Sequence, residues 1–477
     1  MVEQSLKDKT AKGLFWGGLS NGIQQLLNLF FGIFLARLLT PAEYGMVGML
    51  TIFSLIAGSI QESGFISALI NKKDIKHQDY NAVFWFSILT SISIYTVLFF
   101  CAPLIARFFN QPELTSLARY SFLSFVIAST GVAHSAYLSK KLIIKQRAFL
   151  NIIAQIISGI TGVILAYNGF SYWGIATQNI TYISIVMIGY LFISPWRPTL
   201  TFNFAPLKNM ITFSSKILAT NIFNHLNNNI FSIILGKFYS EREVGFYNQA
   251  NKWNGMGYSL INGMINGVAL PILANVVDDR ERQLCVFQKM MRFTAFISFP
   301  IMFGLSLIAP ELITITITNR WIESAQIMQL LCISGAFIPI SGLCSHLIVS
   351  KGKSNIYMWN SIVLGFVQLL TMYLIHPFGI YTMIVTYISI NIFWLIIWYY
   401  FVWREIQYRF INLLKDILPF FTIATGVMII TYYLTLNINT IFIRFISKIL
   451  FSGILYLCIM RLGGFETFKE SISYLKK

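Results

Sequence analysis

Long hydrophobic stretches follow one another along almost the whole chain, with only short polar breaks between them. Each stretch measures roughly 20 residues, enough for a helix to cross about 30 Å of hydrocarbon. Within a bilayer such a segment must be helical, because a single helix satisfies its own backbone polar groups. The pattern therefore predicts about fourteen transmembrane helices by this length criterion. We expect them near residues 13–38, 45–70, 80–105, 114–138, 149–168, 172–194, 213–235, 246–274, 286–309, 324–349, 355–375, 379–403, 413–436 and 440–461.

The first hydrophobic hairpin occurs twice. The stretch from Ser20 to Gly45 aligns without a gap on Thr220 to Gly245, so that Asn28 matches Asn228. Repeats of like orientation are typical of membrane transporters built from two bundles around a central path. We therefore predict an all-α integral membrane protein with two pseudo-symmetric six-helix bundles and a carboxy-terminal helix pair. The expected divisions are residues 1–200, 201–405 and 406–477.

Composition supports the membrane assignment. Hydrophobic residues make up 56% of the chain and charged residues 11%, with a mean hydropathy of +0.67. A water-soluble chain of this size carries far more charge, so the soluble classes are excluded. The five cysteines are scattered, without a C-x-x-C pair or the histidine spacing of a zinc site, and we expect no metal and no cofactor.

The positive charges indicate the orientation of the chain. If the amino terminus is inside, roughly 26 of the Lys and Arg residues fall in cytoplasmic segments, as the positive-inside rule requires. Both termini are then cytoplasmic, and the protein is a multi-pass membrane protein. Because these residues lie in short loops beside the spans, the net charge of +17 is better explained by contact with anionic membrane lipids than by nucleic acid.

Three short motifs resemble a known family. They are ARLLTPAEYG at Ala36 to Gly45, GFISALINKKD at Gly64 to Asp74 and VGFYNQANKW at Val244 to Trp253. Together they resemble the polysaccharide transporter branch, the Wzx-like flippases, of the multidrug, oligosaccharidyl-lipid and polysaccharide exporter superfamily. The resemblance implies a protein of the bacterial inner membrane that moves undecaprenyl-diphosphate-linked glycans or complete polysaccharides outward. We expect a monomeric transport unit that works by alternating access and is not an enzyme.

Polar side chains inside the spans are the candidates for a cargo cavity. Amides recur at helical spacing in the first and seventh spans, and a whole polar face exceeds what packing between membrane helices needs. Cationic side chains would hold a diphosphate or acidic sugars by charge, and amides would hold the glycan by hydrogen bonds. The candidates are Asn21, Gln25, Asn28, Arg119, Lys216, Asn221, Asn224, His225, Asn228 and Lys252. Packing between helices, or snorkelling of Arg119 and Lys216 to the interface, is the competing interpretation.

Charged residues also mark the outer turns of the two repeats. Arg37 with Glu43, and Lys237 with Glu243, occupy matching positions, where they could form a gate or could cap helix ends and set the hairpins. No complete phosphate-binding G-x-x-x-x-G-K-[ST] motif occurs, so coupling to H+ or Na+ is the expected energy input. Glu62 is our candidate for that coupling, with Glu311 as the other intramembrane carboxylate.

Two other functions compete with glycan export. A membrane glycan polymerase or transferase would be expected to carry a sizeable outer loop or a cluster of carboxylates for acid and base chemistry. A drug or cation exporter of the sister branch would require carboxylates or aromatic cages in its cavity, whereas this cavity is predicted to be polar to basic.

Overall fold

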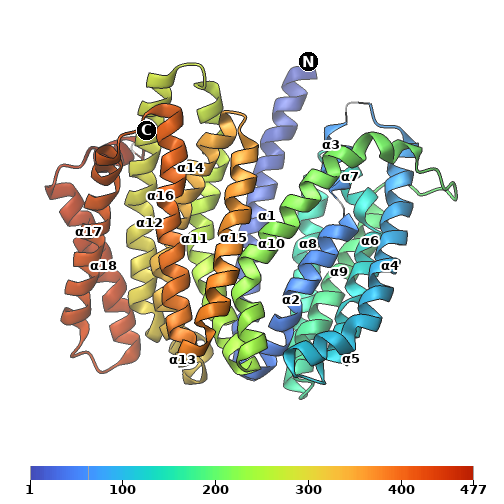
Figure 1. Ribbon diagram of the computed structural model, residues 1–477, viewed down its shortest axis with the longest axis horizontal. Coiled ribbons are helices and arrows are strands. Elements are labelled where there is room, and N and C mark those ends of the chain that lie inside the picture. Colours follow the sequence, from blue (N-terminus) through green and yellow to red (C-terminus); the bar gives the residue numbers. More distant parts are fainter. Residues whose placement is uncertain (1, 63, 73, 476–477) are drawn as a thin grey trace. The chain divides into compact units, whose positions relative to one another are not determined.

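The computed structural model is a bundle of helices (Figure 1). It describes residues 2–475 except 63 and 73, and it does not describe the side chains of residues 2–15, 71, 209, 212, 213, 216, 217, 266 and 471–475. The α-helices are α1 Val2–Leu38, α2 Pro41–Glu62, α3 Phe65–Asn71, α4 His77–Phe109, α5 Leu114–Ser121, α6 Leu123–Ser129, α7 Val132–Lys140, α8 Ile144–Tyr167, α9 Trp173–Ile193, α10 Lys208–Phe238, α11 Glu241–Asn275, α12 Arg280–Ile317, α13 Ile322–Gly335, α14 Ile338–Ser350, α15 Ser354–Ile375, α16 Ile380–Ile406, α17 Phe410–Thr435, α18 Ile441–Leu462 and α19 Glu466–Leu475. Three short 3₁₀ helices, at Ala205–Leu207, Asn319–Trp321 and His376–Phe378, lie between them.

The predicted spans each coincide with a helix or a broken helix. Among the described residues, 12 helices are long and apolar enough to cross a membrane, and a bent pair raises the number to 13. The helix α10 has 31 residues and matches the predicted seventh span, but the polar residues in its middle keep it out of that group. The chain is therefore a multi-pass membrane protein.

Three predicted spans are broken rather than continuous. The second span breaks between α2 and α3 at Gly64, whose φ of +68° is in the left-handed region that glycine adopts without strain. The fourth bends by 45° between α6 and α7. The tenth breaks between α13 and α14, where Pro339 in the first turn of α14 has no backbone N–H to continue the hydrogen-bond ladder.

The contacts divide the chain into two units, residues 1–245 and 246–477. In the first unit, α8 packs against α9 and α1, and α10 packs against α2 and α3. The first unit thus includes α10, which sequence reasoning assigned to the second bundle. The predicted divisions at residues 200 and 405 stay predictions.

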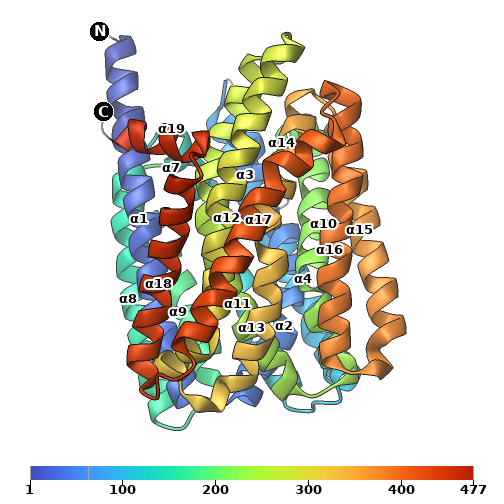
Figure 2. The ribbon, with the colours of Figure 1, turned by 90° about the vertical axis from the view of Figure 1, so that its left-hand side faces the viewer.

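In the second unit, α12 is the central helix. It packs against α13, α17 and α18. Figure 2 shows the short α19 lying across the carboxyl end of α18, where its Phe468 ring lies 6.4 Å from the Phe296 ring of α12. The carboxy-terminal helix pair is therefore packed on the second unit and is not an isolated appendage.

Candidate functional site

Amide side chains form one face of α1 and one face of α10 in the first unit. On α1, Asn21, Gln25 and Asn28 are exposed. On α10, Asn228 is exposed, and the residues at positions 221, 224 and 225 are half-buried. Farther along the same faces, Leu35 on α1 and Leu235 on α10 are buried, so the exposed part of each face is the amide-bearing part. The predicted stripes are thus present on the surface of the unit.

Most of these amides are not used to join helices. Asn28 is the exception, since its Oδ1 accepts a hydrogen bond of 2.8 Å from Gln155 of α8. In the described part of the chain, the side chains of Asn21, Gln25, Asn221, Asn224 and Asn228 form no hydrogen bond with the protein. Because unpaired amides are costly in hydrocarbon, faces of this kind are stable only against water or a polar ligand.

The cationic candidates are in different environments. The Arg119 guanidinium lies 4.2 Å from the centre of the Phe99 ring, and its Nε donates a hydrogen bond to the Phe99 carbonyl. This residue therefore has a packing role against α4. In the second unit, Lys252 of α11 is exposed. The Lys216 side chain lies outside the described residues.

The glutamates of the two repeated turns, at residues 39–43 and 239–243, cap helices. Glu43 accepts hydrogen bonds from the Thr40 backbone N–H at 2.6 Å and from its hydroxyl at 2.8 Å. The matching Glu243 accepts from the backbone N–H of Ser240 at 2.9 Å and from its hydroxyl. These hydrogen bonds satisfy backbone N–H groups that would otherwise be unpaired at the starts of α2 and α11. Both glutamates therefore have a structural role as helix caps. A gating role stays a prediction.

The basic residues predicted beside those turns, Arg37 and Lys237, also lie in the first unit. The Lys237 ammonium donates to the Phe108 carbonyl at 2.9 Å and lies 4.7 Å from the Phe108 ring centre. Arg37 is exposed at the end of α1. Lys237 therefore ties the end of α10 to the end of α4.

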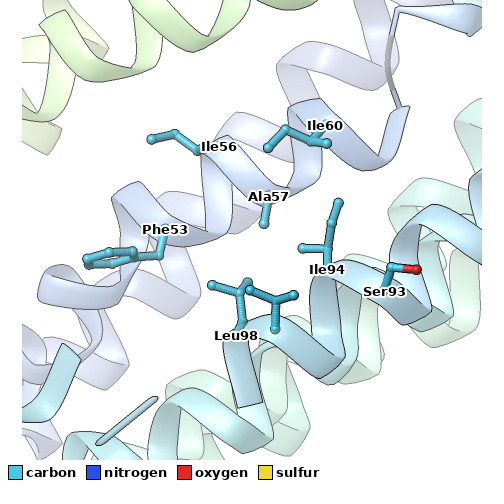
Figure 3. Close-up of a pocket in the computed structure, with 8 residues that line it drawn as sticks. Phe53, Ile56, Ala57, Ile60, Ser93, Ile94 and Leu98 are labelled. Atoms are coloured by element: carbon cyan, nitrogen blue, oxygen red, sulfur yellow. The ribbon is translucent and has the colours of Figure 1, made fainter. Parts of the chain in front are cut away.

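An apolar groove lies between α2 and α4 in the first unit (Figure 3). It has a volume of about 320 Å³. Its lining residues are Phe53, Ile56, Ala57, Ile60, Ser93, Ile94, Val97 and Leu98. Ser93 donates its hydroxyl hydrogen to the Leu89 carbonyl of its own helix at 2.9 Å, so the groove presents an almost wholly apolar surface. It suits a hydrocarbon chain and not a sugar.

Comparison with known proteins identifies the family. Residues 34–326 match the model of a family described as polysaccharide biosynthesis protein, which covers more than half of the chain. The chain belongs to this polysaccharide biosynthesis family. A relative of this chain is the lipopolysaccharide biosynthesis protein WzxC of Escherichia coli strain K12. The two sequences are 24% identical over 358 residues, which cover 74% of this chain and 72% of WzxC.

Solved structures with the same fold are membrane transporters. The lipid II flippase MurJ in its inward closed conformation superposes with a TM-score of 0.76, covering 94% of this chain and 98% of MurJ at 15% identity. An inward-facing multidrug resistance transporter of the MATE family gives a TM-score of 0.58, covering 85% of this chain and 94% of that one at 16% identity. These likenesses confirm the predicted all-α membrane fold of this family member.

Sequence reasoning missed the buried ion pairs of the second unit. Glu311 of α12 is 2% exposed, and one of its carboxylate oxygens lies 2.7 Å from the Lys448 ammonium and 2.9 Å from the Arg444 guanidinium of α18. Lys448 also donates to the Leu307 carbonyl at 3.0 Å. The available signal was the pair of basic residues four positions apart within an apolar span, which brings both onto one helix face.

A second buried carboxylate was also missed. Asp416 of α17 is 2% exposed, and it lies 2.5 Å from the Arg292 guanidinium of α12. The Tyr408 hydroxyl donates a hydrogen bond of 2.6 Å to the other carboxylate oxygen of Asp416. Burial, and to a lesser extent this hydrogen bond, raises the pKa of Tyr408. The intramembrane carboxylate predicted for ion coupling, Glu62, is half-buried at the end of α2 in the first unit. Glu62 therefore differs from Glu311 and Asp416, which hold helices together through ion pairs.

Proposed function

We propose that this protein transports lipid-linked oligosaccharide or polysaccharide across the bacterial inner membrane by alternating access. One observation carries the proposal: the amide candidates on α1, which is a candidate membrane span, and on α10 form almost no hydrogen bonds with the protein. Family membership and the fold shared with MurJ support it. Moving a sugar head group through hydrocarbon is costly, and a polar path removes much of that cost.

The amides are proposed to hold the glycan. Each carboxamide offers a donor and an acceptor, which matches the hydroxyl groups of a sugar. Asn224 and Asn228, four positions apart on α10, would contact neighbouring sugar hydroxyls. The cargo would be linked to undecaprenyl diphosphate, whose apolar chain stays in the lipid while the head group crosses the membrane.

The diphosphate would be met by cations. We assign this role to Lys252, which is exposed on α11, and to Lys216. His225 of α10 would contribute when it is protonated. Arg119 is a weaker candidate, because its guanidinium already packs on the Phe99 ring. Positive charge of this kind suits an anionic head group and disfavours the organic cations taken by a drug exporter.

The orientation follows the distribution of Lys and Arg. Both termini are proposed to be cytoplasmic, which places the turns at residues 39–40 and 239–240 on the outer side. In that orientation the cargo enters from the side on which lipid-linked sugars are made. Proton or sodium coupling through Glu62 is proposed, since Glu311 and Asp416 are already paired with Lys448 and Arg292.

Transport in purified vesicles tests the proposal. Proteoliposomes would receive a fluorescent undecaprenyl-diphosphate-linked oligosaccharide, and its transfer between leaflets would be followed by access to a membrane-impermeant quencher. Protein-dependent transfer that rises under an imposed H+ or Na+ gradient is expected. Transfer equal to that of protein-free vesicles, together with protein-dependent export of a fluorescent organic cation, would favour the drug-exporter alternative.

A further inference from the structure

The segment that joins α9 to α10 is fixed to the first unit. Residues 195–204, here called the strap, are irregular in conformation and connect the two halves of the sequence. Figure 1 shows this green segment beside the beginning of α4. Two prolines, Pro195 and Pro198, limit its backbone freedom. A segment that only tethered two lobes would not need these constraints.

Hydrogen bonds hold the strap against α4. The Asn81 amide donates to the Thr201 carbonyl at 2.7 Å and accepts from the Thr199 backbone N–H at 2.8 Å. The Trp85 indole donates to the Thr199 carbonyl at 2.7 Å. Asn81 therefore satisfies strap backbone groups much as a neighbouring β-strand would, and it fixes which side of the strap faces α4.

A histidine adds a second attachment. The Trp196 indole donates to Nδ1 of His77 at 3.1 Å, and Nε2 of the same ring lies 3.2 Å from the Thr199 hydroxyl. Because an indole N–H can only donate, Nδ1 must be the acceptor and the ring proton is on Nε2. Both ring nitrogens of His77 are thus used to hold the strap.

The strap alternates between polar and apolar side chains. Thr199 and Thr201 are bonded to α4 although both are exposed, and Leu200, Phe202 and Phe204 are 81%, 60% and 38% exposed. The usual arrangement of a surface segment in water is the opposite one, with apolar side chains inward. Leu200 is therefore directed away from the protein, and Phe202 packs on Trp85 of α4 while most of its surface stays exposed.

The strap lies at the depth of the membrane interface. The helix α4 has 33 residues and is about 50 Å long, so it extends about 10 Å beyond each side of a hydrocarbon layer of about 30 Å when centred in it. Trp85 lies about 12 Å from the beginning of α4, and the Phe202 ring packs 4.7 Å from the Trp85 ring. Phe202 is thus level with the boundary between head groups and hydrocarbon, where aromatic residues are preferred.

The charge of the strap fits an anionic surface. Arg197 is exposed in the strap, and Lys208 is exposed just beyond it. No Asp or Glu occurs between Glu113 and Glu241 in the sequence. Basic residues beside apolar ones at an interface are typical of segments that bind anionic lipid heads.

We propose that the strap is an interfacial anchor that binds the anionic phospholipids of the inner leaflet. Leu200, Phe202 and Phe204 enter the region below the head groups, and Arg197 and Lys208 contact lipid phosphates. The assignment to the inner leaflet depends on the proposed orientation of the chain. The anchor keeps the link between the two halves beside α4 while the rest of the protein moves.

Lipid quenching of a fluorescent label measures the depth of the strap. Leu200→Cys and Phe204→Cys would be made in the full chain with the five native cysteines replaced by alanine, labelled with an environment-sensitive fluorophore and reconstituted with phosphatidylethanolamine and phosphatidylglycerol. The lipids would carry a nitroxide at position 5 or position 12 of the acyl chain. The matched control is Asp278→Cys, at an exposed position of the turn between α11 and α12, which belongs to the same side of the membrane in the proposed orientation.

The expected result is at least threefold stronger quenching of both strap labels by the nitroxide at position 5 than of the control, and weaker quenching by the nitroxide at position 12. Quenching equal to that of the control, with free access to aqueous iodide, would overturn the proposal. Protection from iodide without lipid quenching would also overturn it, because protein would then cover the strap. The measurement does not depend on transport, so it separates this proposal from the proposed function.

Discussion

Gly45 and Gly245, which occupy equivalent positions in the two sequence repeats, make reciprocal contacts with each other's helices. A Cβ atom on Gly45 would lie 1.7 Å from the carbonyl oxygen of Glu241, and one on Gly245 would lie 1.8 Å from that of Pro41. Pro41 and Glu241 are themselves equivalent and begin α2 and α11. The turns at residues 39–40 and 239–240 therefore meet backbone against backbone, at a contact that follows the symmetry of the repeat.

Replacing Gly45 by alanine should destabilise the protein. The obstructing atom is a backbone carbonyl, which cannot turn away as a side chain can, so we expect a cost of about 1–3 kcal/mol from overpacking. Gly245→Ala should behave in the same way because its contact is reciprocal. Thermal unfolding in detergent, followed by fluorescence, would show a lower midpoint for both variants.

Gly58→Ala is the matched control, because a Cβ on Gly58, in the same helix, would meet no atom within 4 Å. Its effect should be neutral, or stabilising by up to about 1 kcal/mol through helix propensity. Equal midpoints for Gly45→Ala and Gly58→Ala would contradict the close contact of the turns.

The Glu311→Gln variant should weaken the attachment of the carboxy-terminal helices. Removing this charge leaves the buried Lys448 ammonium and the half-buried Arg444 guanidinium without their partner, and breaking a buried pair typically costs about 3–5 kcal/mol. We expect a lower unfolding midpoint and faster proteolysis of the segment beyond residue 435. Glu281→Gln, at an exposed position of the same helix, should leave both measurements unchanged.

A triple variant shows whether the stability lost in Glu311→Gln comes from the unpaired cations or from a change in side-chain packing. Replacing Glu311, Arg444 and Lys448 together by apolar residues of similar volume removes all three charges, and such replacements are often neutral or stabilising. Most of the stability lost in Glu311→Gln should return. Failure of the triple variant to recover would show that the cluster does more than neutralise charge.

The amides of α1 should separate into two classes. Asn28→Ala breaks the hydrogen bond from Gln155 and should cost about 0.6–2 kcal/mol of stability. Asn21→Ala breaks no described hydrogen bond, so its unfolding midpoint should match that of the unmodified protein. If Asn21→Ala were as destabilising as Asn28→Ala, the α1 face would serve to pack helices and not to line a cavity.

The sequence was sufficient to predict most of the membrane spans because span length is set by a local rule. Hydrocarbon thickness fixes the span length, and Pro41 suits the first position of a helix, which is where α2 begins. The helix breaks at Gly64 and before Pro339 also have local causes, yet they fall inside apolar runs that hydropathy treats as continuous. The 45° bend between α6 and α7 was not foreseen for the same reason.

Long-range pairing was not predictable from one sequence. Asp416 and Arg292 are separated by 124 positions, and no local pattern indicates that they meet. The same holds for Glu311 and Lys448, which are separated by 137 positions. The amide stripe of α10 was foreseen because its spacing is local, whereas the bond from Gln155 to Asn28 required the packing of α8 on α1.

Transport by a variant of the α10 amide face tests the central claim most directly. The double variant Asn224→Ala with Asn228→Ala, reconstituted in vesicles with fluorescent lipid-linked oligosaccharide, should lose at least tenfold of its transport rate while its unfolding midpoint is unchanged. Asn168→Ala, which removes an amide bonded only to the Ile164 carbonyl of its own helix end, should transport normally. A double variant that transports at the unmodified rate would contradict the claim that this face contacts the cargo.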